Sequence, residues 1–374
     1  MIFKQVLMFI LFAFFALGLF DRAIGNRFGI GKEFSKAMDL LGLMTLSIVG
    51  MICLTPALAK VLIPVVTPLY TAIGADPAMF APNFISVDSG GYSLATQMAE
   101  NPLVGRWAGV CIGALPGGTL SFNVPVLFGM VGKENYRTFS IGALSALIAS
   151  PFGCLAGGFA CGLPFLLMLK NLVPVIFVSF CVALGLILIP NVAIKLFVLF
   201  SRFLTLLIAF GLALAVLQRL TGVTILEDML PVGDGLLISG TIAFTCAGAI
   251  CMVYVILHFA EKPLRRIGKK LGLNEVALLN ILICFSTIAP GGAVYNQMNP
   301  RGKVVFSTLA CTAANILGAH MGFVASQDPE MLPALFAAKL TSGILAVPLA
   351  IAFARKLLPP VADVTVVEAC GAEQ

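Results

Sequence analysis

The stretch NFISVDSGGYSLATQMAENP, from Asn83 to Pro102, places Asp88, a glycine pair and several amides among segments that are otherwise apolar. Of the 374 residues, 60% are hydrophobic and 11% are charged, and the mean hydropathy is +1.05. In soluble proteins about a quarter of the residues are charged. Several apolar windows reach the ~20 residues that cross a hydrocarbon core, and their composition favours helices over a β-barrel. The sequence therefore predicts an all-α polytopic membrane protein with a polar interruption at Asn83–Pro102.

A second stretch, NILICFSTIAPGGAVYNQMNP from Asn280 to Pro300, has the same design. Chance similarity between two membrane stretches rich in Gly, Ala and Leu is the alternative to a repeat. The common order of a glycine pair, Gln-Met and Asn-Pro favours an internal repeat. With small gaps, the matched positions are Asn83 with Asn280, Gln97-Met98 with Gln297-Met298, Asn101-Pro102 with Asn299-Pro300, Ser145 with Ser342, and Pro151 with Pro348.

Charge bias indicates how the two halves are oriented. The loop Thr67–Asp76 contains no basic residue, whereas the corresponding loop Glu261–Gly272 contains five. Equivalent loops with opposite bias belong on opposite sides of the membrane, which predicts an inverted-topology repeat. If Asn83–Pro102 crossed the membrane fully, the basic loop Glu261–Gly272 would lie outside and not in the cytoplasm, where its Lys and Arg residues place it. We therefore expect both stretches to be re-entrant or broken helices.

The predicted organisation is one integral membrane transport domain over residues 1–374, with about nine full spans and a range of nine to eleven. Met1–Phe20 lacks a small-x-small cleavage pattern and is interpreted as the first span. The segment Leu115–Pro125 (LPGGTLSFNVP) is expected to interrupt its helix near mid-bilayer. The parts are the first span and a cytoplasmic linker (1–40), repeat A (41–170), connecting spans (171–234), repeat B (235–357) and a flexible cytoplasmic tail (358–374).

Several function classes are excluded. The net charge is +6, but the basic residues lie at the ends of apolar runs, which fits membrane orientation and not nucleic-acid binding. Most of the ten cysteines lie inside apolar segments without a CxxC pair, so we expect neither disulfides nor a metal site. Walker A, HExxH and GxSxG motifs are missing, so we expect no enzyme and no cofactor. The expected partners are the lipid bilayer and a small molecule, and the oligomeric state stays open, a homo-oligomer included.

Asp88 is the residue on which the predicted site depends. A carboxylate at bilayer depth costs about 2.5 to 3.5 kcal/mol on insertion scales, so its presence indicates a function. The alternatives are that Asp88 caps a half-helix, pairs with Arg106 or lies at the interface. The second stretch has Ser286, Thr287 and Pro290 at the matching place. One negative charge opposite neutral polar groups suits a small cation that carries a hydroxyl.

Other polar and aromatic residues complete this hypothesis. Amides can hydrogen-bond the hydroxyl, or bond neighbouring helices instead, and aromatic rings can face an ammonium group. His320 either makes transport respond to pH or has a structural role on its predicted span. The amides are Gln97, Asn123, Gln297, Asn299 and Asn315, and the aromatic residues are Tyr92, Trp107, Phe122 and Tyr295.

From Asp21 to about Lys356 the chain resembles the ethanolamine-utilization permease family, EutH. The order and spacing of several short motifs carry this resemblance. They are Asp21-Arg22, GKEF at Gly31–Phe34, Asp88-Ser89-Gly90-Gly91, CLAGG at Cys154–Gly158, EKPL at Glu261–Leu264, QMxxRGKV at Gln297–Val304, and LGxHxGF at Leu317–Phe323. The family often has an acidic residue directly before the His, where this chain has Ala319. That departure leaves Asp88 as the candidate anion.

The resemblance implies a transporter in the bacterial inner membrane that admits ethanolamine as ethanolammonium. We expect the N-terminus outside and the C-terminus in the cytoplasm. The alternatives are a transporter of another small amine or polar metabolite, and a membrane sensor or intramembrane enzyme that transports nothing. The predicted substrate-binding residues are Asp88, Tyr92, Gln97, Asn123, Gln297, Asn315 and His320.

Overall fold

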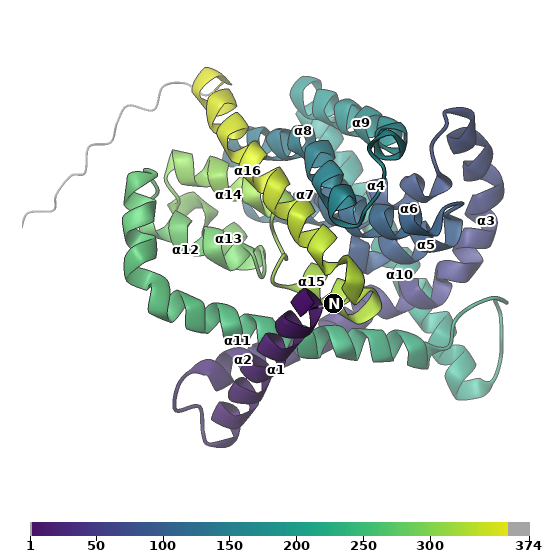
Figure 1. The fold of residues 1–374 in the computed structure, drawn as a ribbon, viewed down its shortest axis with the longest axis horizontal. Coiled ribbons are helices and arrows are strands. Elements are labelled where there is room, and N and C mark those ends of the chain that lie inside the picture. The colour runs from purple at the N-terminus through teal and green to yellow at the C-terminus, as the bar shows by residue number, and fades with distance from the viewer. Residues whose placement is uncertain (1, 358–374) are drawn as a thin grey trace, which may run out of the picture.

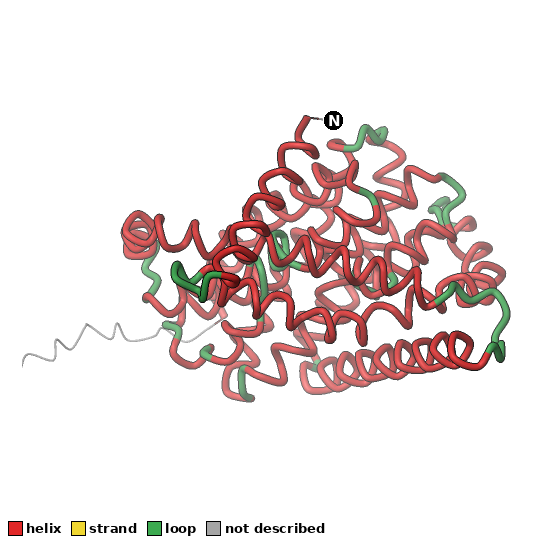
Figure 2. The backbone as a smooth tube through the Cα atoms, turned by 90° about the horizontal axis from the view of Figure 1, so that it is seen from below, coloured by secondary structure: helices red, strands yellow, loops and turns green. Residues whose placement is uncertain are grey.

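The computed structural model describes residues 2–357, and the predicted tail at 358–374 lies outside the described residues. All regular structure in the described part is helical, which confirms the all-α prediction (Figure 2). The first half contains α1 (Ile2–Ala23), α2 (Ile30–Met44), α3 (Gly50–Ala72), α4 (Phe80–Phe84), α5 (Gly91–Met98), α6 (Pro102–Trp107), α7 (Val124–Met130) and α8 (Tyr136–Ala160). The second half contains α9 (Phe165–Leu188), α10 (Pro190–Thr221), α11 (Val232–Lys270), α12 (Glu275–Cys284), α13 (Ala289–Ala293), α14 (Pro300–Thr312), α15 (Ala319–Gln327) and α16 (Leu332–Leu357).

Eight helices in residues 2–357 are long and apolar enough to cross a membrane, where we expected about nine. The difference arises around His320, which we predicted to lie on one span. Residues 313–318 instead divide that region into α14 and α15. Asn315 has a φ angle of 59°, a left-handed conformation that ends a helix and that Asn adopts more readily than most residues.

The predicted interruption at Leu115–Pro125 is wrong, because the chain stays helical from Pro102 to Met130. The middle of this helix is π-helical over Ala108–Gly117 and Thr119–Asn123. In an α-helix, proline removes one N–H donor and its ring clashes with the carbonyl four residues earlier. The wider π-helical turn, with i→i+5 hydrogen bonds, gives Pro116 more room. Proline therefore changes the pitch of this helix without ending it.

Three segments that we predicted to be linkers or loops are largely helical. The linker that ends at Leu40 contains α2, the loop Thr67–Asp76 is mostly the end of α3, and Glu261–Gly272 is mostly the end of α11. Apolar windows mark only the hydrocarbon part of a helix. In the linker and in Glu261–Gly272, Lys, Arg and Glu are good helix formers and extend the helix. Pro263 lies inside α11, and this helix changes direction towards its C-terminal end (Figure 1).

Both polar stretches are broken into short helices. The first contains α4, a 3₁₀ turn at Val87–Ser89 and α5, and the second contains α12, α13 and a 3₁₀ turn at Tyr295–Gln297. Each stretch packs against an irregular part of the helix that follows it. A Cβ atom on Gly117 would collide with the carbonyl oxygen of Ile85, and one on Gly318 with that of Ser286.

Six of the helices pack in two groups of three. α8, α14 and α16 pack on one another, and α1, α2 and α11 form a second group at the lower edge of Figure 1. Two hydrophobic clusters make up most of the core. One includes Trp107 and Phe323, and the other includes Phe139 and Phe306. The first broken stretch contributes Val87 and Ala95 to the first cluster, and the second contributes Ile281 and Ile288 to the second cluster, so both stretches are part of the core.

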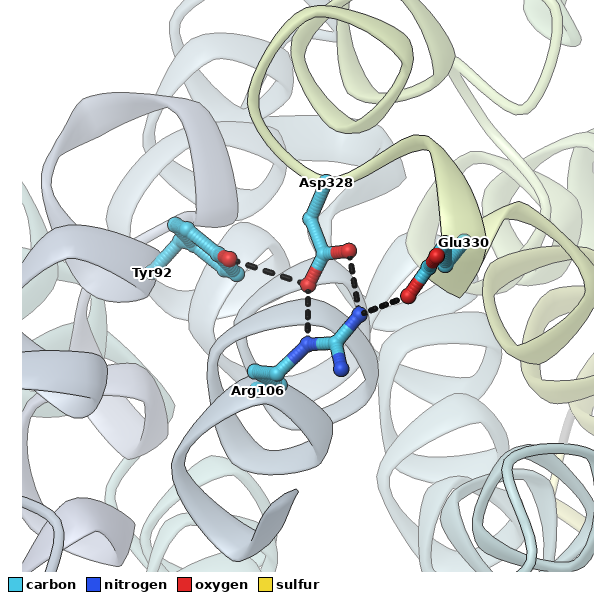
Figure 3. A network of polar contacts seen from close by, with 4 residues as sticks. All are labelled: Tyr92, Arg106, Asp328 and Glu330. Carbon is cyan, nitrogen blue, oxygen red and sulfur yellow. Dashed lines mark hydrogen bonds and ion pairs between the residues drawn. The ribbon is translucent and has the colours of Figure 1, made fainter. Parts of the chain in front are cut away.

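A network of charged groups joins α6 to the turn between α15 and α16 (Figure 3). Arg106 Nε donates to Asp328 Oδ2 at 2.6 Å and Arg106 Nη2 to Asp328 Oδ1 at 2.6 Å. Arg106 Nη2 also donates to Glu330 Oε2 at 3.1 Å, and the Tyr92 hydroxyl donates to Asp328 Oδ2 at 3.0 Å. Arg106 therefore pairs with Asp328 and Glu330, and not with Asp88 as one of our alternatives had it.

We expect Gly117→Ala and Gly318→Ala each to lower stability by about 1–3 kcal/mol, because the new methyl group overlaps a carbonyl oxygen that cannot move freely. The matched control is Gly240→Ala in α11, where a Cβ atom would meet nothing within 4 Å. Thermal unfolding followed by fluorescence of the single tryptophan, the buried Trp107, measures the effect. Equal melting temperatures for all three variants would contradict the close packing of the breaks.

We expect Asp328→Asn to cost about 3–5 kcal/mol, because it removes one partner of a largely buried, bidentate pair. The side chain of Asp328 is 7% exposed. Lys60→Gln is the control, because it breaks a pair with Asp228 whose side chains are 71% and 48% exposed and which contributes about 0–1 kcal/mol. The difference in melting temperature between these variants is the measurement, and a larger loss for Lys60→Gln would refute the assignment.

Candidate functional site

A polar layer crosses the centre of the fold between the two hydrophobic clusters. In the helix that starts with α6, Leu115 belongs to the first cluster and Leu120 to the second. Between Ala314 of the second cluster and Met321 of the first, the chain passes through the break at 313–318. The polar side chains of this layer come from residues far apart in the sequence, so tertiary packing brings them together.

Asp88 lies in this layer at the turn between α4 and α5. Ser86 Oγ donates to Asp88 Oδ1 at 2.6 Å, and Ser89 Oγ donates to the same oxygen at 3.3 Å. Asp88 and Ser89 are only partly buried, whereas Ser86 is 1% exposed. Two serine hydroxyls therefore hold the carboxylate, in a residue that keeps some exposed surface.

Ser86 connects Asp88 to His320. The distance from Ser86 Oγ to His320 Nε2 is 3.3 Å, and His320 is 1% exposed. Because the Ser86 hydroxyl gives its proton to Asp88, it can only accept from the imidazole, which assigns the proton of a neutral ring to Nε2. Nδ1 then carries a lone pair, and it is a buried atom without a hydrogen-bond partner in the described part of the chain. This atom can accept a hydrogen bond from a bound molecule.

Backbone contacts hold Ser86 in place. Its N–H donates to Ser121 Oγ at 3.1 Å, and Ser121 Oγ donates to the Gly117 carbonyl at 2.8 Å. The turn that carries Asp88 is thus attached to the π-helical segment. A Cβ atom on Gly118 would come within 3.1 Å of His320 Cε1. The small residues after Pro116 allow the turn and the histidine to approach the same helix.

Lys339 is a buried cation in this layer that sequence reasoning missed. Its side chain comes from α16 and is 1% exposed. Lys339 Nζ donates to the carbonyl oxygens of Ala314 at 2.7 Å, Ala114 at 3.0 Å and Thr312 at 3.2 Å. Three acceptors match the three N–H donors of an ammonium group. A lone lysine in the apolar run LPALFAAKLTSGILAVPLA is the same kind of signal as Asp88 and could have identified it.

The charge distribution therefore differs from our expectation of one isolated carboxylate. Asp88 and Lys339 are close enough to interact electrostatically. The ammonium group, however, is bonded to backbone carbonyls, and both serine hydroxyl bonds to Asp88 reach Oδ1. The layer contains a positive charge held by the backbone and a negative charge with accessible surface.

Two of the predicted amides are buried near this layer. Asn123 is 1% exposed and its Oδ1 is a buried atom without a partner within residues 2–357. Asn315 is 7% exposed, and its N–H donates to the Cys284 carbonyl at 3.2 Å. Ser286, from the second broken stretch, likewise has a buried Oγ without a partner in the described part. Of these groups, Asn123 Oδ1 and Ser286 Oγ are free to bind a hydroxyl.

The other predicted residues lie elsewhere. Gln97 and Gln297 are exposed, Phe122 is 46% exposed, and Tyr92 binds Asp328. Three further side chains are used structurally. They are Trp107, whose Nε1 donates to the Cys154 carbonyl, Tyr295, whose hydroxyl is bonded to Ser307, and Asn299, which caps α14 through the N–H of Gly302.

Comparison with known proteins identifies the chain's relatives. The profile of the family described as "Ethanolamine utilisation protein, EutH" matches residues 3–353. The chain is 39% identical over 355 residues to the "Probable ethanolamine permease EutH" of Listeria monocytogenes serotype 1/2a (strain 10403S), with 95% of each chain covered. It is 33% identical over 401 residues to the protein of the same name from Escherichia coli (strain K12), with 97% of each chain covered.

A third relative is the "Uncharacterized protein YxeR" of Bacillus subtilis (strain 168), which is 37% identical over 343 residues, covering 92% of this chain and 93% of the relative. No solved structure gives a significant match. A permease is a transporter, and the eight apolar helices of residues 2–357 agree with that class. The protein is therefore a multi-pass membrane protein, and its chain belongs to the EutH family of ethanolamine utilisation proteins.

Proposed function

We propose that this protein carries ethanolamine, in its charged ethanolammonium form, across the bacterial inner membrane and binds it at Asp88. The observation that supports this most is Asp88, a partly exposed residue in the central polar layer that Ser86 connects to His320, whose Nδ1 has no partner in the described part of the chain. The names of the relatives from Listeria and Escherichia coli support the choice of substrate. A carboxylate and a neutral acceptor together match one ammonium group and one hydroxyl.

In this proposal the ammonium group of the substrate binds Asp88 through a charge-assisted hydrogen bond. The substrate hydroxyl donates to His320 Nδ1 or to Asn123 Oδ1. Asn315 belongs to the same site because its left-handed backbone forms the break in front of His320. The exposed amides of Gln97 and Gln297 contact the substrate on opposite sides of the binding site, one before and one after it binds Asp88.

Tyr92 acts indirectly in this proposal. Its hydroxyl is bonded to Asp328, and its ring packs edge-on against Phe323 with centroids 5.8 Å apart. It thereby connects α5, which follows the Asp88 turn, to α15, which carries His320. A change in the Arg106 network would therefore shift both the Asp88 turn and the helix that carries His320.

We further propose that the protein consists of two repeats of inverted topology. Contacts at matched positions support this. Asp76 accepts from the N–H of Asn101, and Asn274 accepts from the N–H of Asn299. Asn101 and Asn299 then cap helices that begin with proline. Arg106 binds the turn before α16, and Lys303 binds Asn135 in the turn before α8 at 2.8 Å.

The inverted repeat suggests how transport proceeds. The Arg106 network and the Lys303–Asn135 bond each connect the helix that follows one broken stretch to the turn before the last helix of the other repeat. We propose that they lie on opposite sides of the membrane, with the N-terminus outside and the C-terminus in the cytoplasm. Opening one network while the other stays closed gives access to Asp88 from one side at a time.

We expect Asp88→Asn to lower the initial rate of ethanolamine uptake by at least about tenfold, because a charge-assisted hydrogen bond contributes roughly 1.5–3 kcal/mol. Labelled ethanolamine entering proteoliposomes with purified protein is the measurement. Asp39→Asn, which removes a charge from an exposed position on α2, is the control and should keep the wild-type rate. Unchanged uptake by Asp88→Asn would remove Asp88 from the site.

The charged form of the substrate makes a separate prediction. Lowering the external pH reduces the neutral amine that crosses lipid unaided, so flux into protein-free vesicles should fall. Uptake through the protein should persist, and the ratio of the two fluxes should rise as the pH falls. A constant ratio would indicate that the neutral amine is the transported species.

Competition distinguishes the proposed substrate from other small amines and polar metabolites. Unlabelled ethanolamine should reduce labelled uptake more strongly than choline, larger amino alcohols or nucleosides at equal concentration. Stronger competition by one of these would assign the transporter to that class. Binding of ethanolamine without movement across the sealed bilayer would instead identify a sensor.

A further inference from the structure

The environment of Lys339 resembles an ion-coordination site more than a salt bridge. Its Nζ has three carbonyl oxygens within 3.2 Å, and they come from the π-helical segment Ala108–Gly117, from the last residue of α14 and from the break after it. No described carboxylate oxygen lies within 4.0 Å of this nitrogen. Backbone oxygens at helix breaks are the ligands with which transporters coordinate sodium ions.

The local field favours a cation at this place. Two of the carbonyls lie at the C-terminal end of α14, where the helix dipole is negative. Asp88 adds a negative charge within electrostatic reach of the same nitrogen. The other titratable groups that interact electrostatically with Lys339 are the thiols of Cys284 and Cys311 and the imidazole of His320. The three carbonyls and Asp88 thus offset part of the cost of removing a positive charge from water at this buried position.

We propose that Lys339 is a tethered cation that fills a binding site for a monovalent metal ion. The carbonyl oxygens of Ala114, Thr312 and Ala314 form that site, and the ammonium group takes the position of a sodium ion. The wild-type protein then needs no free cation there. Removing the side chain without filling its space vacates the site and makes it able to bind sodium.

Two substitutions separate this role from simple helix capping. Lys339→Ala removes the charge and leaves room for an ion. Lys339→Met removes the same charge but leaves an unbranched apolar chain in the space. If the lysine only caps α14, both variants lose stability alike and sodium rescues neither. If it occupies an ion site, sodium rescues the alanine variant alone.

The experiment measures thermal unfolding of the purified full-length protein through Trp107 fluorescence. Sodium chloride replaces N-methyl-D-glucamine chloride mole for mole, so that ionic strength stays constant. We expect no change in the melting temperature of the wild type or Lys339→Met, and a saturable rise of about 5 °C for Lys339→Ala. The readout does not depend on transport, so it stands whether or not the protein carries ethanolamine.

Three results would overturn the proposal. In the first, sodium, lithium and potassium leave the melting temperature of Lys339→Ala unchanged. In the second, sodium raises the melting temperature of Lys339→Met as much as that of Lys339→Ala. In the third, sodium raises the melting temperature of the wild type in a saturable way. Should neither variant fold, ethanolamine uptake by the wild type decides. Replacing sodium by N-methyl-D-glucamine on both sides should leave the rate unchanged, and a tenfold loss would show that the tethered cation does not replace sodium.

Discussion

Backbone groups inside an apolar environment must find hydrogen-bond partners within the protein, and the rest of this structure depends on how that constraint is met at the helix breaks. A broken helix exposes carbonyl and N–H groups that water cannot reach at membrane depth. Here Lys339 satisfies three carbonyls, and the Asn315 and Leu317 N–H groups donate to carbonyls of the facing break at 3.2 and 2.8 Å. The breaks therefore stabilise one another, which lets irregular backbone persist at the centre.

The same constraint explains why the polar residues form one layer. Charges and free acceptors are tolerated only where other polar groups surround them. Asp88, Ser86 and His320 are connected in series, and Lys339 supplies the opposite charge. The two hydrophobic clusters lie on either side of this layer. The layer that we propose as the substrate site is thus part of the arrangement that stabilises the fold.

Residue patterns predicted much of this architecture. Composition indicated an all-helical membrane protein, and the amides, glycines and Asp88 of Asn83–Pro102 predicted a broken helix there. Helix pitch and continuity were harder to predict. Pro116 predicted a break where a π-helix continues, whereas the break beside Asn315 lacked a proline. Proline only removes a donor, and the packing of neighbouring segments decides how the helix responds.

By itself the sequence determined which residues are too polar for hydrocarbon, because a charged side chain in the membrane costs free energy unless it finds partners or water. It also determined the family, through motifs spread over the whole chain. Only the tertiary structure decided which of those residues meet. Gln97 lies on the exposed side of α5, whereas Lys339, from the last helix, reaches carbonyls of two other segments. Such contacts depend on how helices distant in the sequence pack, and no local pattern of residues contains that information.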